Sequence, residues 1–90
     1  APRPLSAQKP WSRCIASWYR SPYGPRSTAH KTLPKGTRLI VRHAGRSVIV
    51  TVRDRGPYIA GRCLDLDDDS FRVLAPLSRG ILPVTWKVVR

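Results

Sequence analysis

Asp54 is the strongest candidate for a chemically active residue. It follows the alternating, strand-like run Ser47–Arg53 and precedes the pair Gly56–Pro57, with Arg55 as its next neighbour. A carboxylate fixed at a strand end by a tight turn can act as a general acid or base. Nearby cations favour its charged form, whereas burial favours its neutral form. The same setting also fits a structural carboxylate that accepts turn amides or pairs with Arg55, and spacing alone leaves both interpretations open.

Histidine and aromatic side chains accompany Asp54 in the sequence. His30 lies in a loop segment that leads into a predicted strand, where it could move protons near neutral pH or act only as a hydrogen-bonding surface group. His43 lies beside a predicted hairpin tip and needs no functional role. Sugar rings stack on aromatic side chains, and four of these lie near the candidate segments: Trp18, Tyr19, Tyr23 and Tyr58. For Trp18, packing in the core is the simpler alternative.

The acidic and sulfur-bearing residues do not form a recognisable metal site. The segment Asp65–Asp69 lacks the glycine and the terminal glutamate of an EF-hand loop, and helix capping explains its aspartates better. Cys14 and Cys63 lie far apart, which fits neither a zinc cluster nor a C-x-x-C redox pair. A glycine-rich phosphate loop is also missing from the sequence. We therefore expect no metal and no cofactor.

The two cysteines favour a disulfide in an oxidising compartment. A domain of 90 residues has a small core, and closing so long a loop could stabilise it by roughly 4 kcal/mol. The alternative is a pair of buried free thiols in a cytosolic protein. The chain begins at Ala1 without a methionine or an apolar signal segment. We therefore expect a trimmed product that is secreted or resides in the cell envelope, and no apolar run approaches the ~20 residues that span a bilayer.

The charge of the chain points to anionic partners. Seventeen Lys and Arg stand against five Asp, which gives a net charge of +12. Such a field attracts polyanions, among them nucleic acid, anionic lipid and the anionic polymers of bacterial cell walls. The basic residues are scattered and form no block or helical stripe, so a merely cationic surface is the alternative. Because no nucleic-acid-binding motif is recognised, we expect no specific nucleic-acid partner.

The elements that position these residues are predicted to be mostly strands. Residues 1–11 read as a flexible leader and residues 12–90 as one domain. β-Branched and alternating runs predict strands at 12–19, 37–43, 47–53 and from 84 onward. Residues 44–46 form a hairpin loop between two of them.

The rest of the chain contains turns, loops and one helix. Residues 20–36 carry three prolines and two glycines and should be mostly loop. Residues 58–66 contain apolar stretches, and an Asp cap within residues 67–70 should begin a short helix that ends at Pro76. Five or six strands with one short helix are typical of a small closed barrel.

Four motifs resemble those of one known family and occur in its order. They are Ala16–Tyr19, Thr28–Thr37, Val52–Tyr58 and Gly61–Leu66. Together they resemble the rare lipoprotein A double-psi β-barrel domain over residues 14 to 89. The resemblance implies an all-β fold, a small six-stranded double-psi β-barrel with one short helix and a groove on its surface.

The resemblance also implies an activity and its residues. Catalytic members of that family are lytic transglycosylases, which cleave peptidoglycan glycan and leave a 1,6-anhydro end, with an aspartate acting as acid and then base. By matching motif, Asp54 would take this role and His30 would line the groove beside it. The expected substrate-binding residues are Tyr19, Tyr23, Arg55, Tyr58 and Arg62. Arg62 and Asp65 would brace the barrel at the second psi loop.

The chain departs from that family at one place. Catalytic members usually have a longer segment between the first two motifs, with a glutamate that faces the groove. Here only residues 20–28 lie between Tyr19 and the pair Ala29–His30, and the chain contains no Glu.

Three functions therefore stay open. The first is a peptidoglycan lytic transglycosylase that lacks the usual glutamate. The second is a non-catalytic binder of peptidoglycan or another anionic cell-wall polymer. The third is a secreted inhibitor of a cysteine protease, because similar small barrels include such inhibitors and the proline-bearing loop 21–25 could enter a protease cleft. We expect a monomer in each case.

Overall fold

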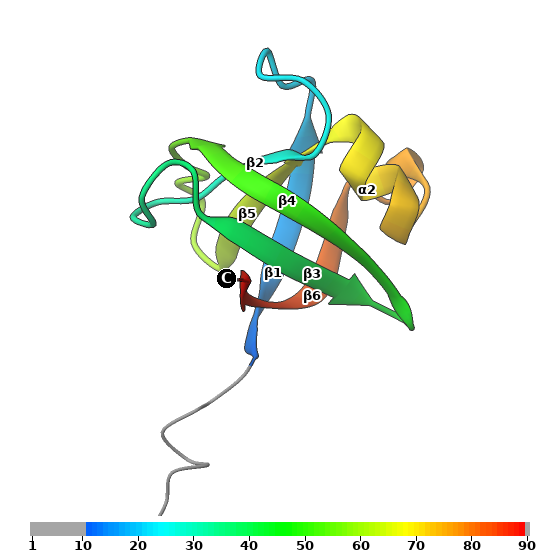
Figure 1. Ribbon diagram of the computed structural model, residues 1–90. Coiled ribbons are helices and arrows are strands. Elements are labelled where there is room, and N and C mark those ends of the chain that lie inside the picture. The colour runs from blue at the N-terminus through cyan, green and yellow to red at the C-terminus, as the bar shows by residue number, and fades with distance from the viewer. Residues whose placement is uncertain (1–10, 90) are drawn as a thin grey trace, which may run out of the picture.

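The computed structural model describes residues 11–89, so the leader predicted for residues 1–11 lies almost entirely outside the described residues. In chain order the elements are β1 (Ser12–Tyr19), β2 (Ser27–Ala29), β3 (Arg38–His43), β4 (Arg46–Asp54), β5 (Arg62–Asp67), α2 (Asp68–Leu74), the 3-10 helix η1 (Leu77–Arg79) and β6 (Ile81–Val89) (Figure 1). The strands close into a barrel in the order β1-β5-β2-β4-β3-β6. The predicted all-β, six-stranded double-psi barrel is confirmed.

The β3–β4 hairpin forms where the β-branched runs predicted it. Val48, Val50 and Val52 alternate into the core from β4, as expected for a strand with one buried face. Ala44 and Gly45 both have positive φ, 50° and 82°, which is the geometry of a two-residue hairpin turn whose twist matches that of its strands. Arg46, predicted in the loop, is the first residue of β4.

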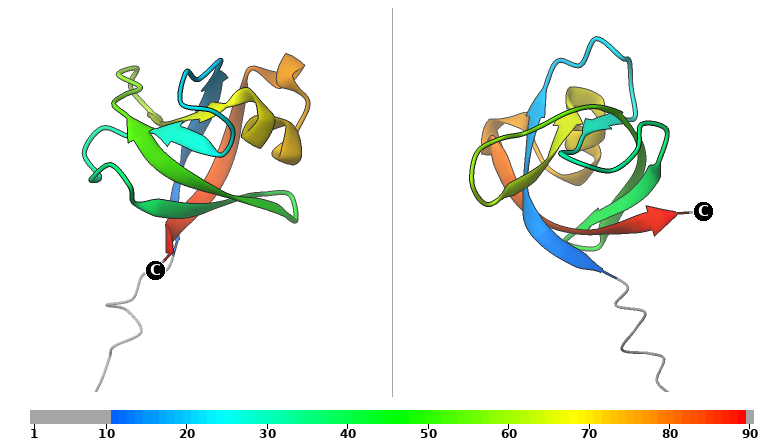
Figure 2. Two further views of the ribbon diagram at one scale, coloured as in Figure 1. Left: turned by 45° about the horizontal axis from the view of Figure 1, so that its top comes forward. Right: turned by 90° about the vertical axis from the view of Figure 1, so that its left-hand side faces the viewer.

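Two of the six strand pairings that close the barrel are parallel. β1 runs parallel to β5, and β2 runs parallel to β4 while pairing antiparallel with β5. The strands curve around one interior in both views of Figure 2. β2 lies inside the segment predicted to be mostly loop. The sequence did not predict this strand because its pairing partners, β4 and β5, are distant in sequence.

The single α-helix of the described chain packs its apolar face on the barrel core. The predicted Asp cap is Asp67, whose side chain accepts a hydrogen bond from the backbone N–H of Ser70. Phe71 and Leu74 are buried with the strand residues in one core. Trp18 also packs against this core, and its indole N–H donates to the carbonyl of Leu77 over 3.0 Å. Trp18 therefore contributes to packing, as the simpler interpretation held.

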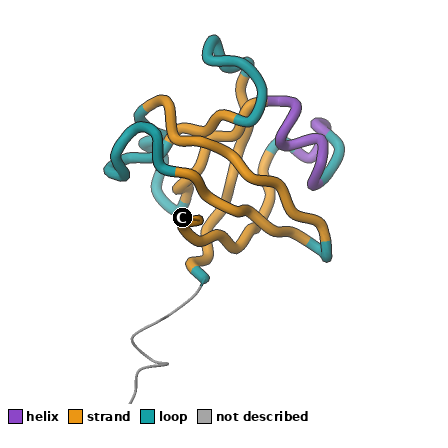
Figure 3. The backbone as a smooth tube through the Cα atoms, viewed as in Figure 1, coloured by secondary structure: helices purple, strands orange, loops and turns teal. Residues whose placement is uncertain are grey.

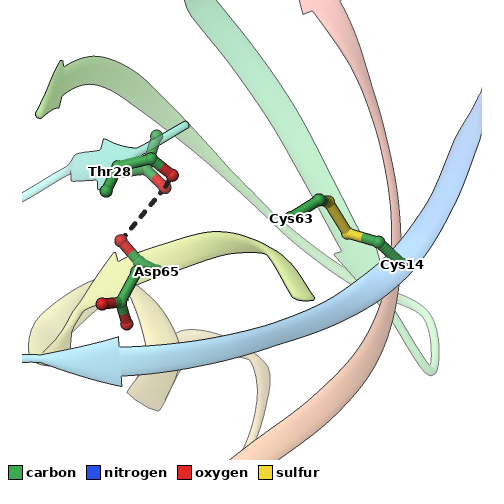
Figure 4. Close-up of a disulfide and its surroundings, with 5 residues drawn as sticks. Cys14, Thr28, Cys63 and Asp65 are labelled. Carbon is green, nitrogen blue, oxygen red and sulfur yellow. Dashed lines mark hydrogen bonds between the residues drawn. A yellow bond between two sulfur atoms is a disulfide. The ribbon is translucent and has the colours of Figure 1, made fainter. Parts of the chain in front are cut away.

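Cys14 and Cys63 form the predicted disulfide between β1 and β5 (Figure 4). Their Cα atoms are 5.9 Å apart, the ordinary separation for a disulfide. The alternative of two free thiols is therefore wrong. Across residues 11–89, the structure contains no helix that could span a membrane.

Candidate functional site

Strand register brings two aspartates to one edge of the barrel. Ala29 of β2 pairs with Asp54 of β4 on one side and with Asp65 of β5 on the other. Asp65 in turn pairs with Ser17 of β1. Neighbouring strands lie about 4.8 Å apart, so the Cα atoms of the two aspartates, two strands apart, are separated by about 10 Å.

Hydrogen bonds fix the carboxylate of Asp54. The hydroxyl of Tyr19, at the end of β1, donates to Oδ2 over 3.0 Å. The backbone N–H of Arg55 donates to Oδ1 over 2.8 Å. Asp54 thus accepts a turn amide, as one interpretation expected, but the guanidinium of Arg55 turns elsewhere. A carboxylate oriented by two donors and only partly buried is positioned to meet a ligand.

Tyr19 is a donor that keeps its proton. Burial, and then the hydrogen bond to Asp54 and its negative charge, raise the pKa of the Tyr19 hydroxyl from 10.0 to about 12, against an opposing contribution from Ser21. The hydroxyl therefore stays neutral across the physiological range and can only donate to Asp54. Predicted as a substrate-binding residue, Tyr19 orients the carboxylate in this structure.

Asp65 supplies a second ionisable carboxyl. Its Oδ1 accepts from the Ser17 hydroxyl over 3.0 Å, and its backbone carbonyl accepts from the Thr28 hydroxyl over 3.2 Å (Figure 4). Burial raises the pKa of Asp65, and the charge of Asp54 raises it further, whereas Ser17 and Arg62 lower it. Asp65 thus contacts β1 through its side chain and β2 through its backbone carbonyl, and its bracing role stays a prediction. The charge of Asp54 acts on Asp65, which makes Asp65 part of the site.

His30 joins Asp54 through the backbone. Its N–H donates to the carbonyl of Asp54 over 3.2 Å, since β2 and β4 are parallel and end at the same edge. Its ring Nδ1 accepts from the backbone N–H groups of Thr32 and Leu33, both over 3.1 Å. Burial, with the charges of Arg55 and Lys31, lowers the pKa of His30. These contacts describe a neutral imidazole that carries its proton on Nε2 and organises its own loop.

Arg55 clamps the loop of His30 beside the loop that follows β4. Its guanidinium donates to the carbonyls of Leu33 over 2.7 Å and His30 over 3.3 Å. The two loops lie together on one side of the barrel in Figure 3 and in the left-hand view of Figure 2. Predicted to bind substrate, Arg55 here holds the wall of the site in place.

The remaining predicted residues lie in neighbouring loops and strands. Tyr58 is 77% exposed, in the loop after Gly56, and Tyr23 is 51% exposed, in the loop between β1 and β2. Large exposed aromatic rings are available for stacking on a sugar. Arg62 begins β5, and its charge acts on Asp65.

Sequence reasoning did not find the contact between Ser17 and Asp65. These residues are 48 positions apart, and only the parallel pairing of β1 with β5 brings them together. The one local signal was an ionisable residue between two leucines that are fully buried, Leu64 and Leu66.

Comparison with known proteins agrees with this barrel. The family model described as "Lytic transglycolase" matches residues 13–86. The chain belongs to this family. A probable endolytic peptidoglycan transglycosylase RlpA of a Nostoc species is 43% identical over 65 residues, 70% of this chain and 18% of that protein. The corresponding Aquifex aeolicus protein is 40% identical over 93 residues, 87% of this chain and 41% of the relative. The chain thus spans less than half of these relatives of the lytic transglycolase family.

Other similar proteins carry different descriptions. A papain inhibitor of Streptomyces mobaraensis is 36% identical over 76 residues, 83% of this chain and 50% of that protein. A solved Streptomyces papain inhibitor superposes with a TM-score of 0.74 at 25% identity and covers 91% of this chain and 96% of its own. A mutant Clavibacter michiganensis expansin, in complex with cellohexaose, shares the fold with a TM-score of 0.76 at 22% identity, over 89% of this chain and 50% of its own.

Proposed function

We propose that this chain is a peptidoglycan-directed barrel that binds a glycan strand across Asp54 and cleaves it as a lytic transglycosylase. The observation that carries the proposal is the oriented carboxylate of Asp54, at a partly open edge with a second carboxyl, Asp65, in the same row. Membership of the lytic transglycolase family and the RlpA relatives support the choice of substrate.

One acid is enough for this reaction. Asp54 in its protonated form gives a proton to the glycosidic oxygen as the bond to the sugar's anomeric carbon breaks. As the carboxylate, it then takes the proton of the sugar's own 6-hydroxyl, whose oxygen attacks the anomeric carbon and closes the 1,6-anhydro ring. Tyr19 holds the carboxyl in place throughout. Asp65 offers a second carboxyl at an edge where the chain has no glutamate.

The disulfide supports an extracytoplasmic location for this activity. Structural disulfides persist in oxidising compartments and are rare in the cytosol. A bridge between Cys14 and Cys63 therefore agrees with a protein that is secreted or resides in the cell envelope, where peptidoglycan is found.

The test is an assay for anhydro-muropeptides. The oxidised chain is incubated with purified sacculi and glycan strands, and the products are analysed by mass spectrometry. We expect 1,6-anhydro products from the wild type and a loss of at least about 100-fold in rate for Asp54→Asn, since general acid–base catalysis contributes that much or more. Asp69→Asn, an exposed aspartate outside the site, is the matched control and should keep the wild-type rate. Equal yields from wild type and Asp54→Asn would contradict the proposal, as would binding to sacculi without products, which would indicate a non-catalytic binder.

A second candidate function is inhibition of a cysteine protease. The papain inhibitor relative favours it, as does the loop between β1 and β2. There the Ser21 hydroxyl accepts from the backbone N–H of Tyr23 and from the Ser27 hydroxyl, which leaves the Tyr23 ring exposed on a braced loop. Inhibition of papain at micromolar concentration, weakened in Tyr23→Ser, is the expected result. Full papain activity at that concentration would remove this candidate.

A further inference from the structure

A groove of about 540 Å³ lies beside the β3–β4 hairpin, which is at the end of β4 opposite Asp54. Its lining includes Arg13 and Ile15 of β1, Arg42 and His43 at the end of β3, and Pro83 and Thr85 of β6. The β3–β4 hairpin turns beside it, and β4 runs from this hairpin to Asp54 (Figure 1). Nine strand residues span about 25 Å, so the hairpin end of the groove is far from Asp54.

Strand register lines up cations along this groove. Thr85 of β6 pairs with Arg13 on one side and with Arg42 on the other. Residues paired directly across neighbouring strands point to the same face, so the Cα atoms of the two arginines lie about 10 Å apart on the outer surface. The backbone carbonyl of Pro83 accepts a hydrogen bond from His43 Nδ1 over 2.8 Å, which ties the hairpin end to β6.

Cation–π contacts with Trp11 hold two cations beside the groove. The guanidinium of Arg42 and the ammonium of Lys87 each lie 4.9 Å from the centre of the Trp11 ring. Such contacts fix long cationic side chains that would otherwise sample many rotamers. We call the surface formed by Trp11, Arg13, Arg42, Thr85 and Lys87 the cationic face.

The cationic face has no carboxylate of its own. β1, β3 and β6 contain no acidic residue, and all five aspartates of the chain lie between positions 54 and 69. Within residues 11–89, the ion pairs are those of Arg72 with Asp68 and Asp69. Arg42 and Lys87, held on one ring, and the neighbouring Arg13 repel one another without a counter-charge, and an anion bound between them relieves this repulsion.

We propose that the cationic face and its groove bind a phosphodiester-linked polyol chain, the chemistry of anionic wall polymers. Planar guanidinium groups suit phosphate oxygens, and a thin, flexible chain could follow the groove across Ile15 and Pro83. Nucleic acid fits less well, since base stacking needs a free aromatic surface and the Trp11 ring is already engaged by two cations. This binding site is independent of glycan cleavage at Asp54.

The experiment measures binding of synthetic poly(glycerol phosphate) by calorimetry over a series of salt concentrations. For Arg13→Gln with Arg42→Gln we expect affinity at low salt to fall at least tenfold. The slope of log affinity against log salt should become shallower by about 1.5, the value for two lost phosphate contacts. The matched control is Arg20→Gln with Arg79→Gln, which removes the same charge from exposed positions outside the groove. It should keep the wild-type slope. Near-UV circular dichroism checks that each variant is folded.

Two results would overturn the inference. Equal losses in the two double variants would mean that only the overall charge of the chain attracts the polymer. Binding of a single-stranded oligonucleotide of the same charge, as tight as the polymer and equally dependent on Arg13 and Arg42, would assign the face to nucleic acid instead. Weak oligonucleotide binding with tight polymer binding supports it.

Discussion

At the scale of single residues, the donors around Asp54 decide what its carboxyl group can do. An exposed aspartate rotates freely, whereas Asp54 is held by a phenol from β1 and by the first amide of the turn that follows it. The phenol is at once the orienting group and a reporter, because its own ionisation responds to the charge it contacts.

The ionisation of Tyr19 is therefore a direct probe of the site. Ultraviolet titration should resolve one phenol with a pKa of about 12, and Tyr19→Phe should remove that step. Asp54→Asn should lower this pKa only in part, because burial is its largest cause. A pKa raised in the folded state contributes stability below pH 10, which is lost as the pH rises from about 10 to about 12. A wild-type titration without a late step would contradict the proposed contact.

Local sequence could identify Asp54 and His30 but not all that surrounds them. The tight turn after a strand marked Asp54, and the loop motif marked His30. The partners of these residues come from elsewhere in the chain: Tyr19 is 35 positions from Asp54, and Ser17 is 48 from Asp65. Contacts of that range depend on which strands become neighbours, and periodicity within one strand carries no information about that.

At the scale of elements, those that local sequence signals specify were predictable, whereas those that depend on partners distant in sequence were not. β1, the hairpin and α2 follow from β-branched runs, turn residues and an Asp cap, all of which act within a few positions. β2 was missed because its three residues are too few to show a period. They are extended because β4 and β5 supply hydrogen-bonding partners on both sides.

Asp67 connects helix α2, which the sequence predicted, to strand β2, which it did not. Asp67 is 2% exposed, and its carboxylate accepts from Ser70 N–H at the start of α2 and from Ser27 N–H at the start of β2. Asp67→Ala removes a helix cap and leaves a buried amide without a partner, so unfolding should become easier by about 2–4 kcal/mol. Urea denaturation followed by circular dichroism measures this loss.

Asp69→Ala is the matched control for Asp67→Ala. Asp69 lies on the same turn but is exposed and pairs with Arg72 on the surface. Its loss should cost about 1 kcal/mol or less. Equal effects of the two substitutions would contradict the role given to Asp67, since they would show that only charge near the helix start matters.

At the scale of the whole molecule, the acidic residues are confined to one part of the barrel. The five aspartates gather between the end of β4 and the start of α2, whereas β1, β3 and β6 carry only cations. The acid–base chemistry proposed for Asp54 and the polyanion binding proposed for the cationic face therefore use different strands of the barrel. Both depend on a closed arrangement of strands from distant parts of the chain, and β1 and β5, which bring Tyr19 and Asp65 to the site, are cross-linked by the disulfide.

The disulfide should therefore account for a large part of the stability of the barrel. It joins residues 49 positions apart, and closing a loop of this length in the unfolded chain stabilises the native state by roughly 4 kcal/mol. Because domains of this size have total stabilities of about 5–15 kcal/mol, Cys14→Ser with Cys63→Ser should shift the urea midpoint strongly downward. Reduced wild type should unfold at the same midpoint as this variant, because both lack the cross-link. A decrease of less than about 1 kcal/mol in the free energy of unfolding would mean that strand pairing alone holds β1 against β5. The edge that carries both aspartates would then need no covalent support.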